Sequence, residues 1–185
     1  SRLAPADSGF DLREKLFMRL NTMGLVQDLH LDYAARLDDA LALADFRFDM
    51  RSGRFNVTIE GRMEGDQLIC RLDSGGTAKT VRLRFDAPPY LPAGILPAVA
   101  ATGFAPGRTL RFPIFDPATM GQGEVSVTVV GPGEVTIGDA SVPAHEVELR
   151  FKGLSQRAWI DDAGGVLKEA GLLGLEQIRQ GQGLF

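Results

Sequence analysis

The stretch Phe46-Arg-Phe-Asp-Met-Arg-Ser-Gly-Arg-Phe-Asn-Val-Thr-Ile-Glu60 decides the fold of this chain. On each side of Ser52 and Gly53, apolar residues occupy every second position, and charged or polar residues occupy the positions between them. Because successive side chains of a β-strand point to opposite faces, this spacing predicts two strands that are apolar on one face only. The Ser-Gly pair between them is typical of a tight turn. The stretch therefore predicts an antiparallel hairpin with one face in water.

The same two-residue period recurs along most of the chain. It is found in segments that begin near Leu25, Val81, Leu110, Val125 and Val147, with turns rich in Gly and Asp between them. No helical pattern alternates with these segments, which disfavours a parallel βαβ sheet. A sheet with one apolar face must curl or be covered. We therefore expect a mainly β fold, in which a curved antiparallel sheet of about ten strands forms a half-barrel or open barrel.

One short helix interrupts the predicted strands near residues 95–103. Leu96, Val99 and Ala100 fall on one side of this helix, and Gly103 suits its C-terminal end. The first 20 residues fit a helix face and a strand equally well. We therefore expect an N-terminal extension or first strand over residues 1–24, followed by a single β-rich domain over residues 25–180.

Composition narrows the class of protein. The chain has 185 residues, 44% of them hydrophobic, and a net charge of −4 with no basic cluster, which argues against a nucleic-acid partner. The longest apolar stretch, residues 91–104, is interrupted by prolines and glycines and is shorter than the roughly 20 residues of a membrane-spanning helix. The single cysteine excludes an internal disulfide and a multi-thiolate metal site.

Two motifs that suggest catalysis or phosphate binding have simpler explanations. Asp73-Ser-Gly-Gly76 is similar to the nucleophile loop of trypsin-like proteases, but Leu72 stands where that family has glycine, and no histidine has the family's surroundings. A hairpin turn explains it. Residues 75–80 and 103–109 lack the spacing of a phosphate loop and run into strands, not helices.

The histidines and the cysteine favour structural roles. His30 shares a strand face with Asp28 and Asp32, which is more typical of a solvated face than of a metal site. His145 has the parity of Val147 and is expected on or near the buried face, in the core or at its rim. Cys70 lies in an apolar register and is expected to be buried and inert. We predict no catalytic residue, no cofactor and no metal ligand.

The last third of the chain carries a recognisable pattern over residues 107–176. Its parts are Gly107-Arg-Thr-Leu-Arg-Phe-Pro-Ile-Phe-Asp116, Trp159-Ile-Asp-Asp-Ala-Gly-Gly165 and Gly171-Leu-Leu-Gly-Leu-Glu176. This pattern resembles the uncharacterised β-rich domains of bacterial envelope proteins, including those that precede transglutaminase-like modules in longer chains. The resemblance implies a non-enzymatic domain that is periplasmic or otherwise extracytoplasmic once a leader has been removed.

We therefore expect a non-catalytic binding or accessory domain of a bacterial cell-envelope protein, with another protein or an apolar ligand as its partner. The first alternative is a lipid or lipoprotein carrier with a hydrophobic groove under the helix at residues 95–103. The second is a fragment of a larger hydrolase or transglutaminase-like protein. A ligand would contact Trp159, Leu96 and Val99. Against a carrier, bulky residues are expected to fill the core opposite the helix: Phe46, Phe48, Phe55, Val57, Leu83 and Phe85.

Overall fold

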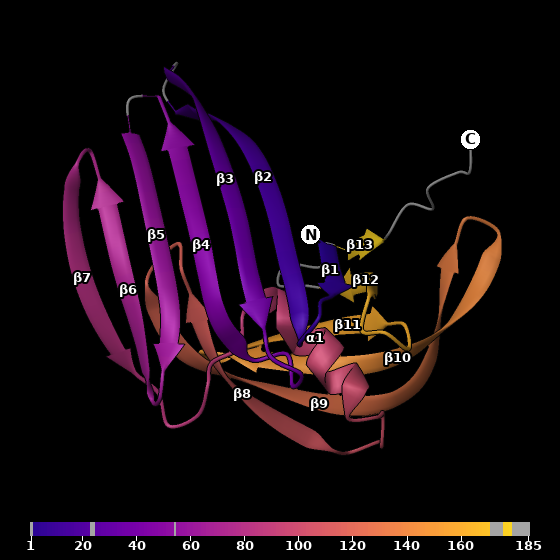
Figure 1. Ribbon diagram of the computed structural model, residues 1–185. Coiled ribbons are helices and arrows are strands. Elements are labelled where there is room, and N and C mark those ends of the chain that lie inside the picture. The colour runs from indigo at the N-terminus through magenta and orange to yellow at the C-terminus, as the bar shows by residue number, and fades with distance from the viewer. Residues whose placement is uncertain (1, 23–24, 54, 171–175, 179–185) are drawn as a thin grey trace. The chain divides into compact units, whose positions relative to one another are not determined.

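The computed structural model describes residues 2–22, 25–53, 55–170 and 176–178, and within them it confirms a mainly antiparallel β fold with one short helix (Figure 1). The strands are β1 (Arg2–Pro5), β2 (Phe10–Thr22), β3 (Leu25–Leu37), β4 (Leu43–Ser52), β5 (Phe55–Glu64), β6 (Gln67–Ser74), β7 (Thr77–Arg84), β8 (Thr109–Asp116), β9 (Gly121–Ile137), β10 (Ala140–Phe151), β11 (Leu154–Ile160), β12 (Val166–Ala170) and β13 (Glu176–Ile178), and the helix is α1 (Pro92–Ala101).

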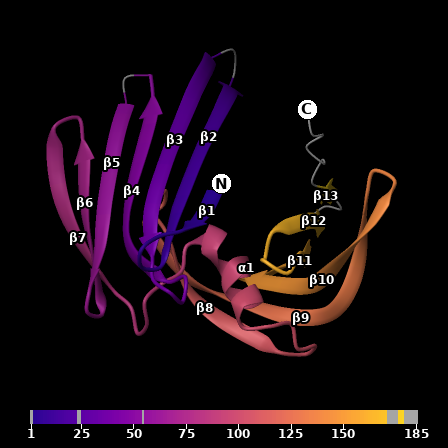
Figure 2. The ribbon, with the colours of Figure 1, turned by 45° about the vertical axis from the view of Figure 1, so that its right-hand side comes forward.

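The strands form two sheets, and neither sheet closes into a ring. The first is a seven-stranded meander of β1 to β7 in chain order, and the second has six strands in the order β13-β12-β11-β10-β9-β8 (Figure 2). The chain divides into two compact units, Ser1–Leu91 with Phe115–Gly121, and Pro92–Ile114 with Gln122–Phe185. The described part of residues 1–24 forms strands, whereas the single domain over residues 25–180 stays a prediction.

One face of the seven-stranded sheet carries the core of the first unit. A single row across β2 to β6 contains Leu12, Ala35, Phe46, Gly61 and Cys70, and the four side chains of this row are buried. Gly61 leaves room for the Phe46 ring, since a Cβ on Gly61 would lie 2.1 Å from Phe46 Cε1. Phe115 packs its ring against Phe46, with ring centroids 5.3 Å apart. The row therefore depends on a missing side chain in β5.

In the second unit, α1 packs against the turn between β11 and β12. A Cβ on Gly164 would lie 2.5 Å from the Leu96 carbonyl oxygen and 2.6 Å from Pro97 Cα. The helix buries Gly94, Ile95, Ala98 and Val99. The predicted buried side was Leu96, Val99 and Ala100, and only Val99 is fully buried, so the inner face is rotated by about one position. Among the described residues, no helix is long and apolar enough to cross a membrane.

His145 is half-buried at the rim of the second sheet, on the same strand face as Val147, as its parity predicted. The pairing of β9 and β10 shifts register between Glu146 and Val147. The extra residue of this bulge is Val130 in β9, whereas β10 pairs with β11 without a shift, so His145 and Val147 lie on one face, opposite the buried Ile160 and Ala158. The His145 ring stacks on Phe104 at 3.7 Å between centroids, and its Nε2 lies 2.9 Å from Asp162 Oδ1.

Candidate functional site

The apolar face of the seven-stranded sheet becomes more exposed towards one end of β2 to β5, the end where Thr22 pairs with Leu25 and Ser52 pairs with Phe55. Two rows of side chains lie there, and we call their apolar members the apolar strip: Leu16, Leu31, Met50 and Val57 in one row, and Met18, Leu29 and Phe55 in the next, where Ser52 lies between Leu29 and Phe55. Leu16 is 46% exposed and Phe55 is 74% exposed, and the other five are half-buried. A contiguous apolar patch of this kind is typical of an interaction surface.

Phe55 was predicted to lie in the core, and this prediction was wrong. Phe55 is the first residue of β5, and it pairs with Ser52 at the turn end of the β4–β5 hairpin. The small side chain of Ser52 lies opposite the Phe55 ring and does not cover it, so the ring stays in solvent. Among the other residues expected to fill the core, Phe46, Phe48 and Phe85 are buried, whereas Val57 and Leu83 are half-buried.

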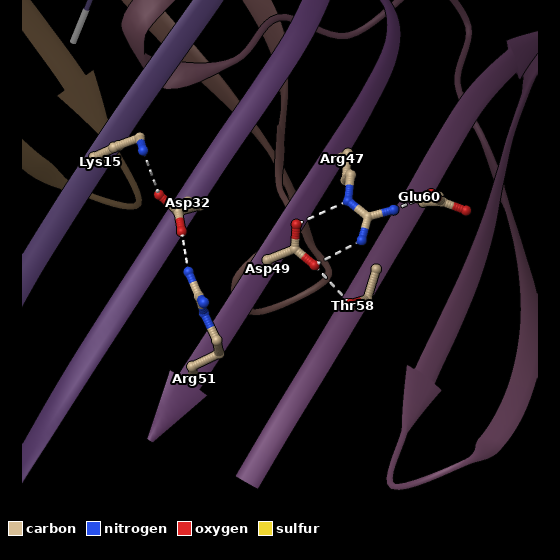
Figure 3. Close-up of polar contacts among 7 residues, drawn as sticks. All are labelled: Lys15, Asp32, Arg47, Asp49, Arg51, Thr58 and Glu60. Atoms are coloured by element: carbon tan, nitrogen blue, oxygen red, sulfur yellow. Dashed lines mark hydrogen bonds and ion pairs between the residues drawn. The ribbon is translucent and has the colours of Figure 1, made fainter. Parts of the chain in front are cut away.

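The opposite face of the same strands is charged, and Arg47 is the centre of its largest cluster (Figure 3). Arg47 Nε and Nη2 donate to Asp49 Oδ2 and Oδ1 at 2.8 and 3.0 Å, and Nη1 donates to Glu60 Oε1 at 2.5 Å. Thr58 Oγ1 donates to Asp49 Oδ1 at 2.6 Å. The hydrogen bonds from Arg47, followed by the one from Thr58, lower the pKa of Asp49 below its ordinary value against the opposing effect of burial. This cluster ties β4 to β5.

A second cluster ties β2 and β4 to β3. Asp32 Oδ2 accepts from Arg51 Nη2 at 2.5 Å, and Asp32 Oδ1 lies 3.6 Å from Lys15 Nζ. Closer to the C-terminal end of β2, Arg19 forms two hydrogen bonds to Asp28 of β3, at 2.7 and 3.1 Å. Asp28 and Asp32, which share a strand face with His30, are therefore already paired with cationic side chains. Among the described residues, no three side chains of the metal-ligating types converge.

Two shallow grooves, of about 450 and 180 Å³, lie on this unit. Arg13, Ala34 and Arg47 line both of them, since Ala34 has only a methyl group in a row of long side chains. Carboxylates and guanidiniums alternate around the grooves, and no residue of α1 lines either one. Charge pairs so arranged hold neighbouring strands together, and the face serves as the rigid backing of the apolar strip.

Cys70 and Tyr33 are buried groups of the first unit. Cys70 is fully buried in β6, and burial raises the pKa of its thiol to about 11. A thiol with such a pKa carries little thiolate near neutral pH and is a poor nucleophile. The Tyr33 hydroxyl is buried without a hydrogen-bond partner, and burial raises its pKa further above the usual range.

The residues predicted to contact a ligand lie on separate elements of the second unit. Trp159, on β11, packs on a small core of Val135, Ala144 and Leu167, with Lys168 Nζ 5.1 Å from its ring centroid. Val99 is fully buried in α1 and Leu96 is half-buried. Asp161 accepts hydrogen bonds from the N–H groups of Ala163 and Gly165, which forms the predicted turn after Trp159. The ligand contacts themselves stay a prediction.

Comparison with known proteins gives a likeness of fold. No family model matches the sequence, and no curated protein matches it. A β-barrel-like protein of the domain of unknown function DUF1849 from Brucella abortus matches with a TM-score of 0.67 and 11% identity, over 96% of this chain and 84% of that chain. A DUF1089 family protein from Pseudomonas aeruginosa matches with a TM-score of 0.59 and 14% identity, over 94% of this chain and 90% of that chain. The chain shares their fold.

The resemblance to domains that precede transglutaminase-like modules stays a prediction. Within residues 107–176, the first part of the pattern forms β8 and the second forms β11 with its turn. In the third part, residues 171–175 lie outside the described residues.

Proposed function

We propose that this chain is a non-catalytic binding or accessory domain of a bacterial cell-envelope protein, and that it acts outside the cytoplasm. The apolar strip carries the proposal, since it gathers seven apolar side chains across four strands and leaves two of them exposed. The assignment to the envelope follows the resemblance of residues 107–176. The partner that fits the strip is an apolar surface of another protein.

The physical case for the strip is its combination of apolar chemistry and rigid support. Phe55 and Leu16 cost free energy while they face water, and burying one such side chain is worth about 1.5–3 kcal/mol. The ion pairs of Lys15, Asp32 and Arg51 on the opposite face hold the same strands in register. A surface held in place before binding loses little conformational entropy on binding.

Site-specific photocrosslinking in the bacterium tests this function. A photoreactive phenylalanine analogue at Phe55 is expected to form an adduct with a second protein. The same analogue at Asn56 is the matched control, because Asn56 is also exposed but lies on the charged face. Equal adduct yields at the two positions, or no adduct at Phe55, would contradict the proposal.

The strip is then tested by weakening it. With the analogue at Leu16, a Phe55→Ser change is expected to lower the adduct yield about tenfold, the factor that corresponds to about 1.4 kcal/mol of binding free energy. An Asn56→Ser change is expected to leave the yield unchanged. Stoichiometric lipid extracted from the purified protein by organic solvent would instead favour the carrier.

The location is tested separately. Expressed from its full gene, the protein is expected in the fraction that osmotic shock releases from the periplasm. Recovery with the cytoplasmic enzymes would contradict the envelope assignment and leave the binding role of the strip standing.

A further inference from the structure

The outer edge of β2 is unpaired over most of its length. β1 pairs only with the beginning of β2, from Phe10 to Arg13. Beyond Arg13, residues 14–22 of β2 pair with β3 alone among the strands of the described residues. In an antiparallel sheet, every second residue of such a stretch points its N–H and C=O groups away from the neighbouring strand. This edge therefore offers a row of backbone donors and acceptors to a further strand.

The side chains along this edge combine exposed apolar residues with two cations, Lys15 and Arg19. Leu16 is 46% exposed and Phe17 is 53% exposed, and no proline or glycine interrupts residues 14–22. β7, at the other end of the same sheet, differs. It carries Lys79, Arg82 and Arg84 within eight residues, and positive charges of this kind repel a second copy of the same strand. Of these two edges, the one along β2 carries fewer cationic side chains and is better suited to self-pairing.

We propose that a second copy of this chain pairs with β2 along this edge, antiparallel, with Met18 opposite Met18 of the other copy. The two copies are then related by a two-fold axis perpendicular to the sheet, which is the usual symmetry of a dimer. Residues 14–22 of each copy all find a backbone neighbour in this register. The inference concerns the backbone edge of β2 and not the partner of the apolar strip, although Leu16 and Met18 belong to both.

The charges on β2 select this register. With Met18 at the axis, Phe17 lies opposite Arg19 and Lys15 lies opposite Asn21, and no two like charges meet. Arg19 already lies over the Phe17 ring within one chain, with its Cζ 5.8 Å from the ring centroid, and the paired strands would add the same cation–π contact between copies.

Shifting the register by one residue in either direction brings like charges together. With Phe17 at the axis, Lys15 lies opposite Arg19. With Arg19 at the axis, two guanidiniums face each other. Directly opposite like charges destabilise a strand pair. Larger shifts leave fewer residues paired, so the Met18 register is the longest one and brings no like charges directly opposite each other.

A disulfide across the axis tests the register. The variant Met18→Cys is made with Cys70→Ala, so that the introduced thiol is the single one in the chain. Opposite residues of an antiparallel pair have Cα atoms about 4.5–5.5 Å apart, which suits a disulfide. We expect Met18→Cys to form a covalent dimer under mild oxidation. Leu16→Cys in the same background is the matched control, because two copies of residue 16 are about 13 Å apart along the strand in this register.

Charge substitutions at Phe17 test the association itself by sedimentation equilibrium. Phe17→Lys places an ammonium opposite Arg19 and is expected to weaken the dimer at least tenfold, whereas Phe17→Glu places a carboxylate there and is expected to preserve or strengthen it. Circular dichroism checks that both variants fold. A monomeric wild-type protein, equal weakening by the two substitutions, or equal oxidation of the Met18→Cys and Leu16→Cys variants would overturn the proposal. Loss of the Phe55 adduct would not, because that adduct reports on the apolar strip.

Discussion

Gly61 in the first unit and Gly164 in the second both provide space by lacking a side chain, but what fills the space differs. Beside Gly61 lies the aromatic ring of Phe46, and beside Gly164 lies the main chain of α1 at Leu96 and Pro97. A ring can rotate or be replaced by a smaller side chain, whereas a helix backbone moves only as a whole. At Gly61 a side chain therefore packs on a regular strand, whereas at Gly164 two backbone segments approach each other closely.

The largest effect is expected for Gly164→Ala. The new Cβ would lie 2.5 Å from the Leu96 carbonyl oxygen, and the φ angle of +81° is one that side chains rarely adopt. We expect the free energy of unfolding to fall by more than about 2 kcal/mol, from backbone strain and overpacking together. Urea denaturation followed by Trp159 fluorescence measures this in the second unit.

Gly138→Ala is the matched control for that change. Gly138 also has a positive φ, +60°, but nothing lies within 4 Å of its added Cβ. It is expected to cost about 1 kcal/mol, the strain of the left-handed conformation alone. If the two variants lose the same stability, the close approach of α1 to the turn contributes nothing, and the contrast between Gly61 and Gly164 fails.

A smaller effect is expected for Gly61→Ala, at about 1–3 kcal/mol, because the Phe46 ring can move. Phe46→Leu is expected to recover part of this loss in the double variant, so that the two changes are less than additive. Cys70 lies opposite Gly61 in β6 and reports on the same row. Its labelling by a thiol reagent is expected to be slow in the native protein and faster in Gly61→Ala. If the stability losses of Gly61→Ala and Phe46→Leu are instead additive, the Phe46 ring and the added methyl group do not compete for the same space.

The same contrast explains how much of the fold the sequence predicts. In the first unit, the two-residue period of Phe46, Phe48 and Met50 holds along regular strands, and it correctly predicted the hairpin and its polar face. In the second unit, the bulge adds Val130 to β9, so Val129 and Gly131 share a parity but pair with the successive residues Val147 and Glu146, which lie on opposite faces. A bulge leaves no mark in the spacing of apolar residues unless both neighbouring strands are known.

The apolar strip could not be predicted because burial depends on the position along a strand as well as on the face. Phe55 has the same parity as Val57 and Ile59, yet Phe55 is exposed and Ile59 is buried. Phe55 lies next to the turn of the β4–β5 hairpin, whereas Ile59 lies four residues further along β5. Likewise, the pairing of Arg47 with Glu60 depends on the register that the turn after Ser52 imposes between β4 and β5.

The smallest effect concerns the charged faces of the two sheets. Asp49 in the first unit and Glu148 in the second both have a lowered pKa. The cause at Asp49 is first the hydrogen bonds from Arg47, and the cause at Glu148 is first the one from Ser155 and then that from Arg150. A carboxylate whose pKa is lower in the folded state stabilises the fold above its unfolded pKa. That contribution is lost as the pH falls through the folded pKa.

Asp49→Asn is therefore expected to lower the midpoint of thermal unfolding slightly at pH 7. The corresponding loss in the free energy of unfolding is less than about 1 kcal/mol, because the Arg47–Asp49 ion pair is partly exposed. The difference from wild type should shrink below pH 4 and vanish once Asp49 is protonated in the folded wild-type protein. Glu148→Gln is the counterpart on the second sheet and should show the same sign. Midpoints measured from pH 7 to pH 2 test this, and a difference that persists undiminished at pH 2 would mean that Asp49 acts through packing and not through its charge. A response confined to Asp49→Asn would show that ion pairing stabilises the strands that carry the apolar strip more than it stabilises the bulged strands of the second sheet.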